Sequence, residues 1–418
     1  MPNKGLHFGW VRGFNSNLIL SKLNKARNID GARCSFNSGD FSFWLPVLSS
    51  AIQADREAEP LKSKCVSAAL SDASTDLNKA DLFLPRCDQE FEKLIKRPKS
   101  RFILYTTITY SGPKLIDWIA DDNSRIYWQP SPSGNFMRKA KKAREAQEFQ
   151  RKAKKIPPED DSLCPILVHV SAYDALDAFE TANDYIDRFR GMLNLLINSG
   201  NTIHPFAQLM PPHAVNKFRR GPFHSIHYPD GSLATETFWY EPRWAHTHPS
   251  VTFKDPPDYK RNLQRWWRKL QDNPMREFIS DVLLRYCRAL DLHEADASFL
   301  GIWQVLEKVT DTDKYDLLID RLVRLFRDRE DTREIANHVR RRRNQTVHSA
   351  HNISDEAHSI LIQIETLASQ AIFFYLKNAA KFESRKELCD FLDLPLDQNK
   401  LMRQQKLSKF FVQYLNRK

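Results

Sequence analysis

The sequence is organised around residues 340–348, which read RRRRNQTVH: four consecutive arginines, an amide and, four places later, an imidazole. One set of residues passes through this stretch at intervals of four: Ile335, Val339, Arg343 and Val347. Positions four apart share one face of an α-helix, so the spacing predicts a helix with Arg343 on its packed stripe. A packed arginine is costly unless it is paired or its head group reaches solvent. Arg343 is therefore the one arginine of the four that most needs a specific partner.

Asn344 and His348 form a second pair on the same predicted helix. They are four residues apart and share a neighbouring face, to which Arg340 lies closest. Arg341 and Arg342 point in other directions. An arginine, an asparagine and a histidine can together hold a phosphate, orient it and move a proton. The alternative is an arginine bonded to helix ends beside a surface histidine.

Residues 257–418 show the apolar periodicity of an all-α helical bundle. Six amphipathic helices are predicted, with apolar residues recurring over 263–270, 278–290, 299–309, 317–326, 335–347 and 360–376. Two shorter amphipathic segments follow, at residues 386–392 and 399–415. A bundle of this length is typical of a single domain.

Residues 1–137 are predicted to form a mixed α/β domain that senses a trigger or recognises a substrate. Residues 101–110 and 125–128 are rich in β-branched and aromatic side chains beside turn signals, which predicts strands. The aromatic residues at 41–44 suggest a short earlier strand. The 12 glycines show no G-x-G-x-x-G or Walker-type spacing, so nucleoside-triphosphate hydrolysis is not supported. With the bundle, the predicted fold class is α+β.

Residues 138–161 are predicted to be a basic linker or arm. Nine lysines or arginines occupy positions 138–155, and a stretch with so few large apolar residues is expected to bury little. It is either a nucleic-acid-binding arm or a solvated surface segment. Residues 162–256 are predicted to continue the N-terminal module, with a strand at 165–170, a long amphipathic helix and a β-hairpin around Asp230-Gly231.

Histidines are concentrated in residues 201–256: His204, His213, His224, His227, His246 and His248. His246 and His248 would share one face of a strand, whereas His224 and His227, three apart, would point to opposite faces if they lie on one strand. No cysteine and no H-E-x-x-H pattern accompanies them. We therefore expect no metal and no other cofactor, with a metal-dependent enzyme as the third alternative discussed below.

The composition of the chain indicates which kinds of partner and which cellular compartment to expect. The chain has 418 residues and a formal net charge of +11, a surplus that favours polyanionic partners. Its six cysteines are scattered without a C-x-x-C pair, which fits reduced thiols rather than a disulfide framework. Neither a hydrophobic signal core nor an apolar run of about 20 residues is found. The expectation is a cytoplasmic protein with no membrane partner.

Residues 343–348, Arg-Asn-Gln-Thr-Val-His, resemble the Arg-polar-x-x-x-His signature of HEPN domains. In that family the motif lies on a helix of an all-α bundle. The preceding segment 299–307, FLGIWQVLE, resembles the one before the motif in the Apea-like bacterial branch, and a long hydrophobic helix follows. The resemblance covers roughly residues 274–380 and leaves the first 250 residues uncovered.

The resemblance implies a metal-independent endoribonuclease, often with its site where two bundles pair in a homodimer, and a role in antiviral (phage) defence or as a toxin. RNA can be cut by attack of its 2′-hydroxyl on the adjacent phosphodiester, which needs proton transfer and charge stabilisation. His348 would move the proton, Arg343 would hold the phosphate oxygens and Asn344 would orient the phosphate or the imidazole. Glu307 would pair with Arg343 from a neighbouring helix.

Further expectations concern the partners of such an enzyme. The arginines before the motif, Arg340, Arg341 and Arg342, would guide the RNA backbone, and a phage-derived or other trigger would act on the N-terminal region. The first alternative is a non-catalytic nucleic-acid-binding module. The second is an interaction protein whose bundle only dimerises, and the third is a metal enzyme that uses His246 and His248.

Overall fold

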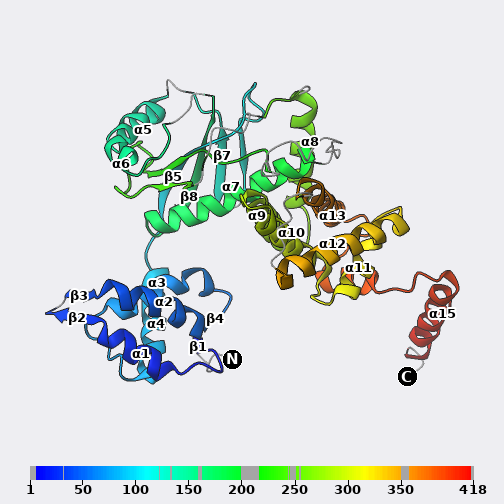
Figure 1. Cartoon of the computed structure of the whole chain (residues 1–418), viewed down its shortest axis with the longest axis horizontal. Coiled ribbons are helices and arrows are strands. Elements are labelled where there is room, and N and C mark those ends of the chain that lie inside the picture. Colours follow the sequence, from blue (N-terminus) through cyan, green and yellow to red (C-terminus); the bar gives the residue numbers. More distant parts are fainter. Residues whose placement is uncertain are drawn as a thin grey trace. The chain divides into compact units, whose positions relative to one another are not determined.

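The computed structural model describes residues 6–31, 33–121, 123–131, 134–158, 162–198, 216–242, 244, 251–253, 256–349 and 357–415. The chain divides into two compact units, Met1–Ser100 and Arg101–Lys418 (Figure 1). Both units contain helices, and strands occur from the N-terminus to residue 240, which confirms the α+β class. The first unit ends at Ser100 rather than near residue 137, because the strands after residue 100 pair with strands from residues 164–240.

The first unit is mainly helical, with two small two-stranded sheets, β1–β4 and β2–β3. Its elements are β1 (Phe8–Trp10), α1 (Ser16–Lys25), β2 (Arg27–Asp30), β3 (Arg33–Phe36), α2 (Ser38–Ala51), β4 (Ile52–Ala54), the 3-10 turn Glu59–Leu61, α3 (Lys62–Ser71) and α4 (Ala80–Ile95). The strand predicted at residues 41–44 is wrong, because these residues lie in α2. Asn37 caps this helix by accepting a hydrogen bond from the Gly39 amide at 3.4 Å.

The second unit begins with a six-stranded sheet in the order β10-β9-β5-β8-β7-β6. The strands are β5 (Ser100–Ile108), β6 (Trp118–Ala120), β7 (Ser124–Trp128), β8 (Cys164–Ala172), β9 (Phe223–His227) and β10 (Trp239–Tyr240). The strands predicted at 101–110, 125–128 and 165–170 are thus confirmed. So is the hairpin, since β9 and β10 pair antiparallel beyond a turn in which Gly231 has φ +92°.

Alternating side chains of the sheet enter two different cores. In β8, Ile166, Val168 and Val170 pack on the same side as helix α7 (Ala175–Asn198). Leu167 instead packs with residues of helix α5 (Asn135–Glu145), on the opposite face. The sheet is therefore covered on both faces.

The basic stretch 138–155 does not behave as the predicted linker or arm. It forms α5 and the short helix α6 (Glu148–Ala153). Arg144 is 2% exposed, donates to the Tyr105 carbonyl at 3.0 Å, and stacks between the rings of Tyr105 and Phe223 at 4.1 and 4.3 Å. A guanidinium can be buried in this way because aromatic faces and carbonyl oxygens both favour its charge.

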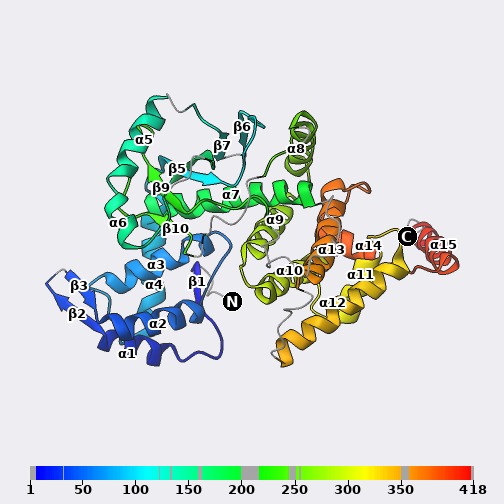
Figure 2. The ribbon, with the colours of Figure 1, turned by 45° about the horizontal axis from the view of Figure 1, so that its top comes forward.

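The remaining helices build the predicted bundle (Figures 1 and 2). They are α8 (Pro256–Gln271), α9 (Arg276–Asp291), α10 (Ala295–Thr310), α11 (Tyr315–Val323), α12 (Arg329–Ser349), α13 (Ala357–Lys377) and α14 (Arg385–Leu392). A last helix, α15 (Gln398–Leu415), follows them and contributes no buried residue to the bundle. One continuous core joins α7, α9, α10 and α13. At Gly191 of α7, an added Cβ would collide with the Leu283 carbonyl of α9, so only glycine permits this close approach.

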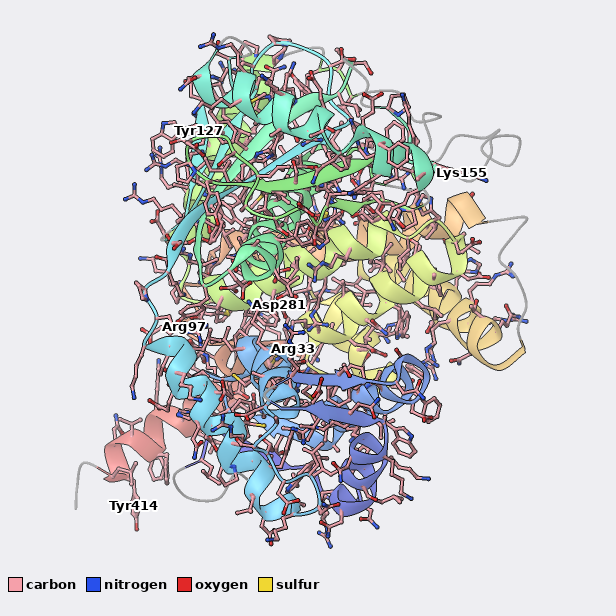
Figure 3. All side chains as sticks on the ribbon, turned by 90° about the vertical axis from the view of Figure 1, so that its left-hand side faces the viewer. Arg33, Arg97, Tyr127, Lys155, Asp281 and Tyr414 are labelled. Atoms are coloured by element: carbon pink, nitrogen blue, oxygen red, sulfur yellow. The ribbon has the colours of Figure 1, made fainter. Side chains whose placement is uncertain are left out.

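Two helices near the end of the chain differ in how they use their apolar residues. Within the described residues, one stretch, Ser359–Lys377 in α13, is long and apolar enough to cross a membrane, but 72% of it is buried inside the bundle. In α15 no residue is buried; Tyr414, for example, is 52% exposed (Figure 3).

The core of the bundle contains a carboxyl group that gives a test of its packing. Glu365 of α13 is fully buried and accepts a hydrogen bond from the Tyr286 hydroxyl of α9. Burial raises its pKa from 4.5 to about 7, although the Tyr286 hydrogen bond opposes the rise. The protonated form is therefore favoured in the folded state.

We predict that Glu365→Gln removes a pH dependence of stability. The pKa of Glu365 is higher in the folded state than in the unfolded state, so protonation of this carboxyl favours folding. Its contribution to the free energy of unfolding is fully present below pH 4.5 and is lost as pH rises through about 7. The free-energy difference between variant and wild type should shift by about 3 kcal/mol in favour of the variant over that window. Denaturant unfolding at pH 4.5 and pH 8 measures it, and an unchanged difference would show that the carboxyl is not buried as described.

Candidate functional site

The RRRRNQTVH stretch lies wholly inside α12, which packs against α11 and α13 (Figure 2). The helix begins with acidic residues, Glu330 and Asp331, which suit its positive N-terminal end. Thr332 lies in this first turn, where its hydroxyl donates to the Asp328 carbonyl at 2.6 Å. The helix predicted from the spacing of residues 335–347 is confirmed.

The buried stripe of α12 differs in part from the predicted one. Thr332, Ala336 and Val339 are buried, whereas Ile335 is 38% exposed. Positions 332, 336 and 339 follow the helical spacing of four and three residues, so the stripe is centred one position later than expected. Arg343 continues this stripe one turn after Val339 and is half-buried.

The Arg343 guanidinium lies over an aromatic ring rather than against a carboxylate. Its central carbon is 5.2 Å from the centre of the Tyr315 ring, at the start of α11. Tyr315 in turn packs edge-on against Trp303 of α10, with ring centres 5.9 Å apart. The predicted partner Glu307 accepts a hydrogen bond from Trp303 Nε1 at 2.7 Å. Aromatic stacking fixes the guanidinium without neutralising its charge.

Two polar atoms of the motif are buried without a hydrogen-bond partner in the described part of the chain: Arg343 Nε and Asn344 Oδ1. Both residues are half-buried on adjacent positions of α12. A buried polar group that lacks a partner costs free energy, so each one calls for an explanation, such as a catalytic role or a bound water or ion. Arg343 and Asn344, at consecutive positions of α12, thus each carry one buried polar atom without a partner.

The three preceding arginines have different environments. Arg340 forms an ion pair with Asp316 at 2.6 Å, and its guanidinium lies 5.4 Å from the centre of the Tyr315 ring. Arg341 is exposed and Arg342 is half-exposed. The Arg340 charge is therefore already compensated, and Tyr315 is shared by Arg340 and Arg343.

His348 lies in the last turn of α12, and its side chain is outside the described residues. The helix places position 348 one turn beyond Asn344, as predicted from the spacing. Val347 is likewise outside the described side chains. The structure therefore brings the three backbone positions of the motif together on one helix.

A second polar cluster, which the sequence did not reveal, lies in the core between α7 and α9. Arg190 and Asp187 of α7 have no exposed surface, and Arg190 binds Asp187 and Asp291 at 2.7 Å each. Arg288 of α9 donates to Asp187 at 3.2 Å. Arg190 Nε also donates to the Phe218 carbonyl at 2.6 Å. The signal for this cluster was a pair of opposite charges three residues apart within the apolar pattern of α7.

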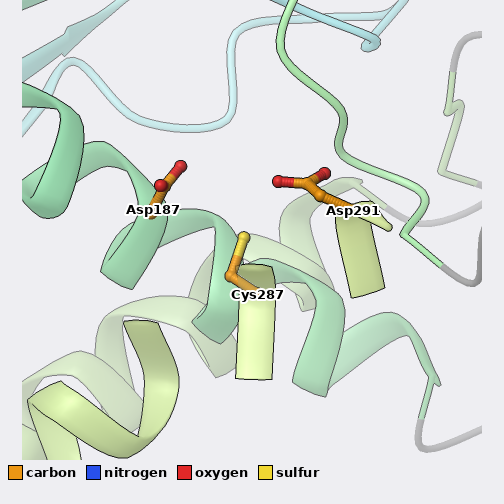
Figure 4. A group of neighbouring side chains, drawn as sticks. All are labelled: Asp187, Cys287 and Asp291. Atoms are coloured by element: carbon orange, nitrogen blue, oxygen red, sulfur yellow. The ribbon is translucent and has the colours of Figure 1, made fainter. Parts of the chain in front are cut away.

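Asp187, Asp291 and Cys287 also form a group with metal-ligating atoms within 4.8 Å of one another (Figure 4). Both carboxylates already bind the Arg190 guanidinium, which supplies the positive charge between them. Burial raises the pKa of the Cys287 thiol well above its usual range, so the thiol stays protonated. The group is therefore an arginine-centred ion network.

The network extends to the sheet through Arg220, Glu241 and His224. Arg220 pairs with Glu241 at 2.8 Å, and Glu241 lies 3.3 Å from His224 Nε2. Burial raises the pKa of Glu241, but the His224 hydrogen bond and the Arg220 charge outweigh this effect and lower it to about 2. Burial lowers the pKa of His224, so the imidazole is neutral at pH 7.

The histidine-rich segment does not converge on one site within the described residues. His224 contacts Phe179 of α7, whereas His227 contacts Phe136 of α5, so they point to opposite faces of the sheet as predicted. Burial lowers the pKa of His227 to about 4. The other four lie outside the described residues: His204, His213, His246 and His248.

We predict that Arg190→Met lowers the free energy of unfolding by about 3–5 kcal/mol, because it removes the guanidinium that Asp187 and Asp291 share and leaves buried Asp187 with only Arg288 at 3.2 Å and Arg220 at 3.9 Å. Denaturant unfolding of the full chain measures the loss. Arg261→Gln is the matched control: this arginine is 70% exposed and pairs with Asp258 on α8, so its loss should cost under about 0.5 kcal/mol. Equal effects of the two changes would contradict a structural role for Arg190.

The chain was compared with known proteins at three levels. No family model, no curated protein and no solved structure matches it. The unsatisfied polar atoms of Arg343 and Asn344 on α12 and the ion network between α7 and α9 are therefore the features from which a function can be inferred.

Proposed function

We propose that this protein is a metal-independent endoribonuclease of the HEPN type, and that α12 carries its active site. Arg343, Asn344 and His348 are the proposed catalytic residues. The 2′-hydroxyl of the RNA attacks the adjacent phosphorus, the bond to the 5′-oxygen breaks, and a 2′,3′-cyclic phosphate forms. A base removes the proton of the 2′-hydroxyl and an acid gives a proton to the leaving 5′-oxygen.

The observation that supports this proposal best is the state of Arg343. The arginine is half-buried and oriented by Tyr315, and no carboxylate in the described part of the chain lies at ion-pair distance from it. A pre-positioned and uncompensated guanidinium suits the negative charge that grows on the phosphate oxygens in the transition state. Asn344 adds a second unsatisfied polar group beside it.

The arginines before the motif take unequal parts in this proposal. Arg341, which is exposed, and Arg342 guide the RNA backbone by charge. Arg340 neutralises Asp316 and flanks Tyr315, so its main effect is to hold the ring on which Arg343 lies.

His348 is the proposed proton-transfer group. An ordinary histidine has a pKa of about 6.5 and can act as acid or base near neutrality. One histidine cannot accept the 2′-hydroxyl proton and donate a different proton to the 5′-oxygen in a single concerted step, so a two-fold pair of bundles would supply the acid and the base from two copies. We therefore include a homodimer, with RNA as the substrate, in the proposal.

The proposed biological setting is the cytoplasm, where cleavage of RNA would serve phage defence or a toxin role. The unit Met1–Ser100 and the sheet of the second unit would then respond to a trigger or recognise the substrate. The need for such control follows from the activity itself, because unregulated RNA cleavage harms the cell that makes the enzyme.

A second candidate function is non-catalytic binding of nucleic acid, for which the outer surface of α5 and α6 gives a specific reason. Arg144 is buried there, but Lys139, Lys141, Lys142 and Lys152 are exposed. Such a surface attracts a phosphate backbone in a salt-dependent way. This function predicts binding without cleavage, and charge removal on α5 would then weaken affinity more than a change at His348.

We predict that Arg343→Ala and His348→Ala each reduce cleavage of single-stranded RNA by about 100-fold or more, since each removes a group that acts in the transition state. Product formation is measured in the presence of a chelator. Matched controls on the same helix are Arg333→Ala, whose arginine pairs with Asp320 at 2.8 Å, and His338→Ala. Full activity of either motif variant, or loss of wild-type activity with the chelator, would refute the proposed site.

The attacking group can be tested on the substrate itself. An RNA with a 2′-deoxy nucleotide at the cleavage position lacks the nucleophile, so we expect it to resist cutting at that position while it still binds. Cleavage is followed by gel electrophoresis, with a deoxy substitution two nucleotides away as the control. Efficient cutting at the deoxy position would rule out attack by the 2′-hydroxyl.

A further inference from the structure

A cavity of about 420 Å³ opens in the second unit, between the segment around β9 and β10 and the junction of α9 and α10. Small-molecule sites in proteins commonly have volumes of about 300–1,000 Å³. Charged and apolar side chains both line it: Arg219, Arg220, Glu241, Pro242, Trp244, Asp291, Leu292, His293, Glu294 and Ala297. The cavity is thus large enough for a small organic molecule.

Most of the charge on its wall is already engaged within the protein. Arg220 pairs with Glu241 at 2.8 Å. Asp291 binds Arg190 at 2.7 Å, and this pair belongs to the ion network between α7 and α9. Figure 4 shows Asp291 beside Asp187 of the same network. The side chains of Arg220, Glu241 and Asp291 are therefore fixed in position, because each forms an ion pair with a group of opposite charge.

Arg219 is the exception on this wall. It is 6% exposed, and its guanidinium donates to His293 Nε2 at 3.0 Å. Within the described residues no carboxylate lies at ion-pair distance from it. Burial lowers its pKa, and the more distant charges of Asp291 and Glu241 offset this only in part. A neutral imidazole can accept a hydrogen bond, but it does not compensate a buried positive charge.

We propose that this cavity binds a small organic anion, whose phosphate or carboxylate group pairs with Arg219. The apolar body of the ligand would lie against Pro242, Trp244 and Leu292. An anion with an apolar body fits both parts of the wall, the buried guanidinium that has no ion-pair partner in the described part of the chain and the apolar side chains. The assignment does not depend on ribonuclease activity, since none of these residues belongs to α12.

The proposal separates the roles of two buried arginines. Arg190 is bonded to two carboxylates and its loss is expected to destabilise the fold. Arg219 has no such partner, so Arg219→Met without ligand should keep or raise the melting temperature, because it removes the cost of burying a charge. A stabilising role in the fold predicts the opposite change.

Isothermal titration calorimetry of the full-length protein tests ligand binding with four probes. AMP carries a phosphate on an aromatic body, and phenylacetate carries a carboxylate on an aromatic body. Adenosine lacks the anionic group, and inorganic phosphate lacks the aromatic body. We expect AMP or phenylacetate to bind, and which of them binds identifies the anionic group. Adenosine and inorganic phosphate should bind at least 10-fold more weakly.

Variants then assign the binding to Arg219. Arg219→Met should weaken binding at least 10-fold, Arg219→Lys should retain part of it as a point charge, and Arg261→Gln on α8 should leave it unchanged. The proposal is overturned if neither AMP nor phenylacetate binds, or if Arg219→Met binds as well as wild type. It is also overturned if Arg219→Met lowers the melting temperature as much as Arg190→Met.

Discussion

The Arg190 guanidinium, fully buried between carboxylates of two different helices, is the contact on which the arrangement of the second unit depends. Asp187 comes from its own helix α7, and Asp291 comes from the end of α9. Since α7 covers the sheet and α9 begins the bundle core, the same side chain fixes both. An ion pair of this kind adds little net stability, but breaking it is expensive, so it favours one docking geometry over others.

That docking determines where α12 can lie. The close contact of α7 with α9 at Gly191 continues through α10, which packs against α9 and carries Trp303. Trp303 supports the Tyr315 ring, and this ring positions the Arg343 guanidinium. The candidate site is therefore built on the outer layer of a core that begins at the sheet, and its geometry depends on contacts far from α12 in the sequence.

Much of this architecture follows from local patterns. The helices after residue 256 are predicted correctly because their apolar residues recur with a period of 3.6. The strands β5, β7 and β8 are predicted correctly because β-branched, aromatic and other apolar residues are concentrated in them. The strand predicted at residues 41–44 is wrong, because an aromatic-rich stretch is compatible with a strand or a helix. Here the Asn37 cap stabilises the helix. Propensity is a weak guide where a cap or a tertiary contact opposes it.

The candidate site was predictable only as far as α12 itself. Helical spacing placed Arg343 on the packed side, yet the exposure of Ile335 and the pairing of Arg340 with Asp316 depend on neighbouring helices. The burial of Arg144 could not be predicted for the same reason. Its guanidinium stacks on the ring of Phe223, which lies 79 positions away in the sequence. Contacts at such separations cannot be read from one stretch of sequence.

The partners of the arginines, more than their number, distinguish structural from functional positions in this protein. Arg321 is 8% exposed and forms two hydrogen bonds to Asp393, at 2.6 and 2.8 Å, so its charge is satisfied by the fold. Arg190 is satisfied in the same way. Arg219 and Arg343 are buried or half-buried with a ring system as their main partner and no carboxylate at ion-pair distance in the described part of the chain. A fold that bears the cost of a buried cation without an ion-pair partner gains stability when an anion binds beside it, and this is the physical basis on which both positions are proposed as sites for anionic ligands.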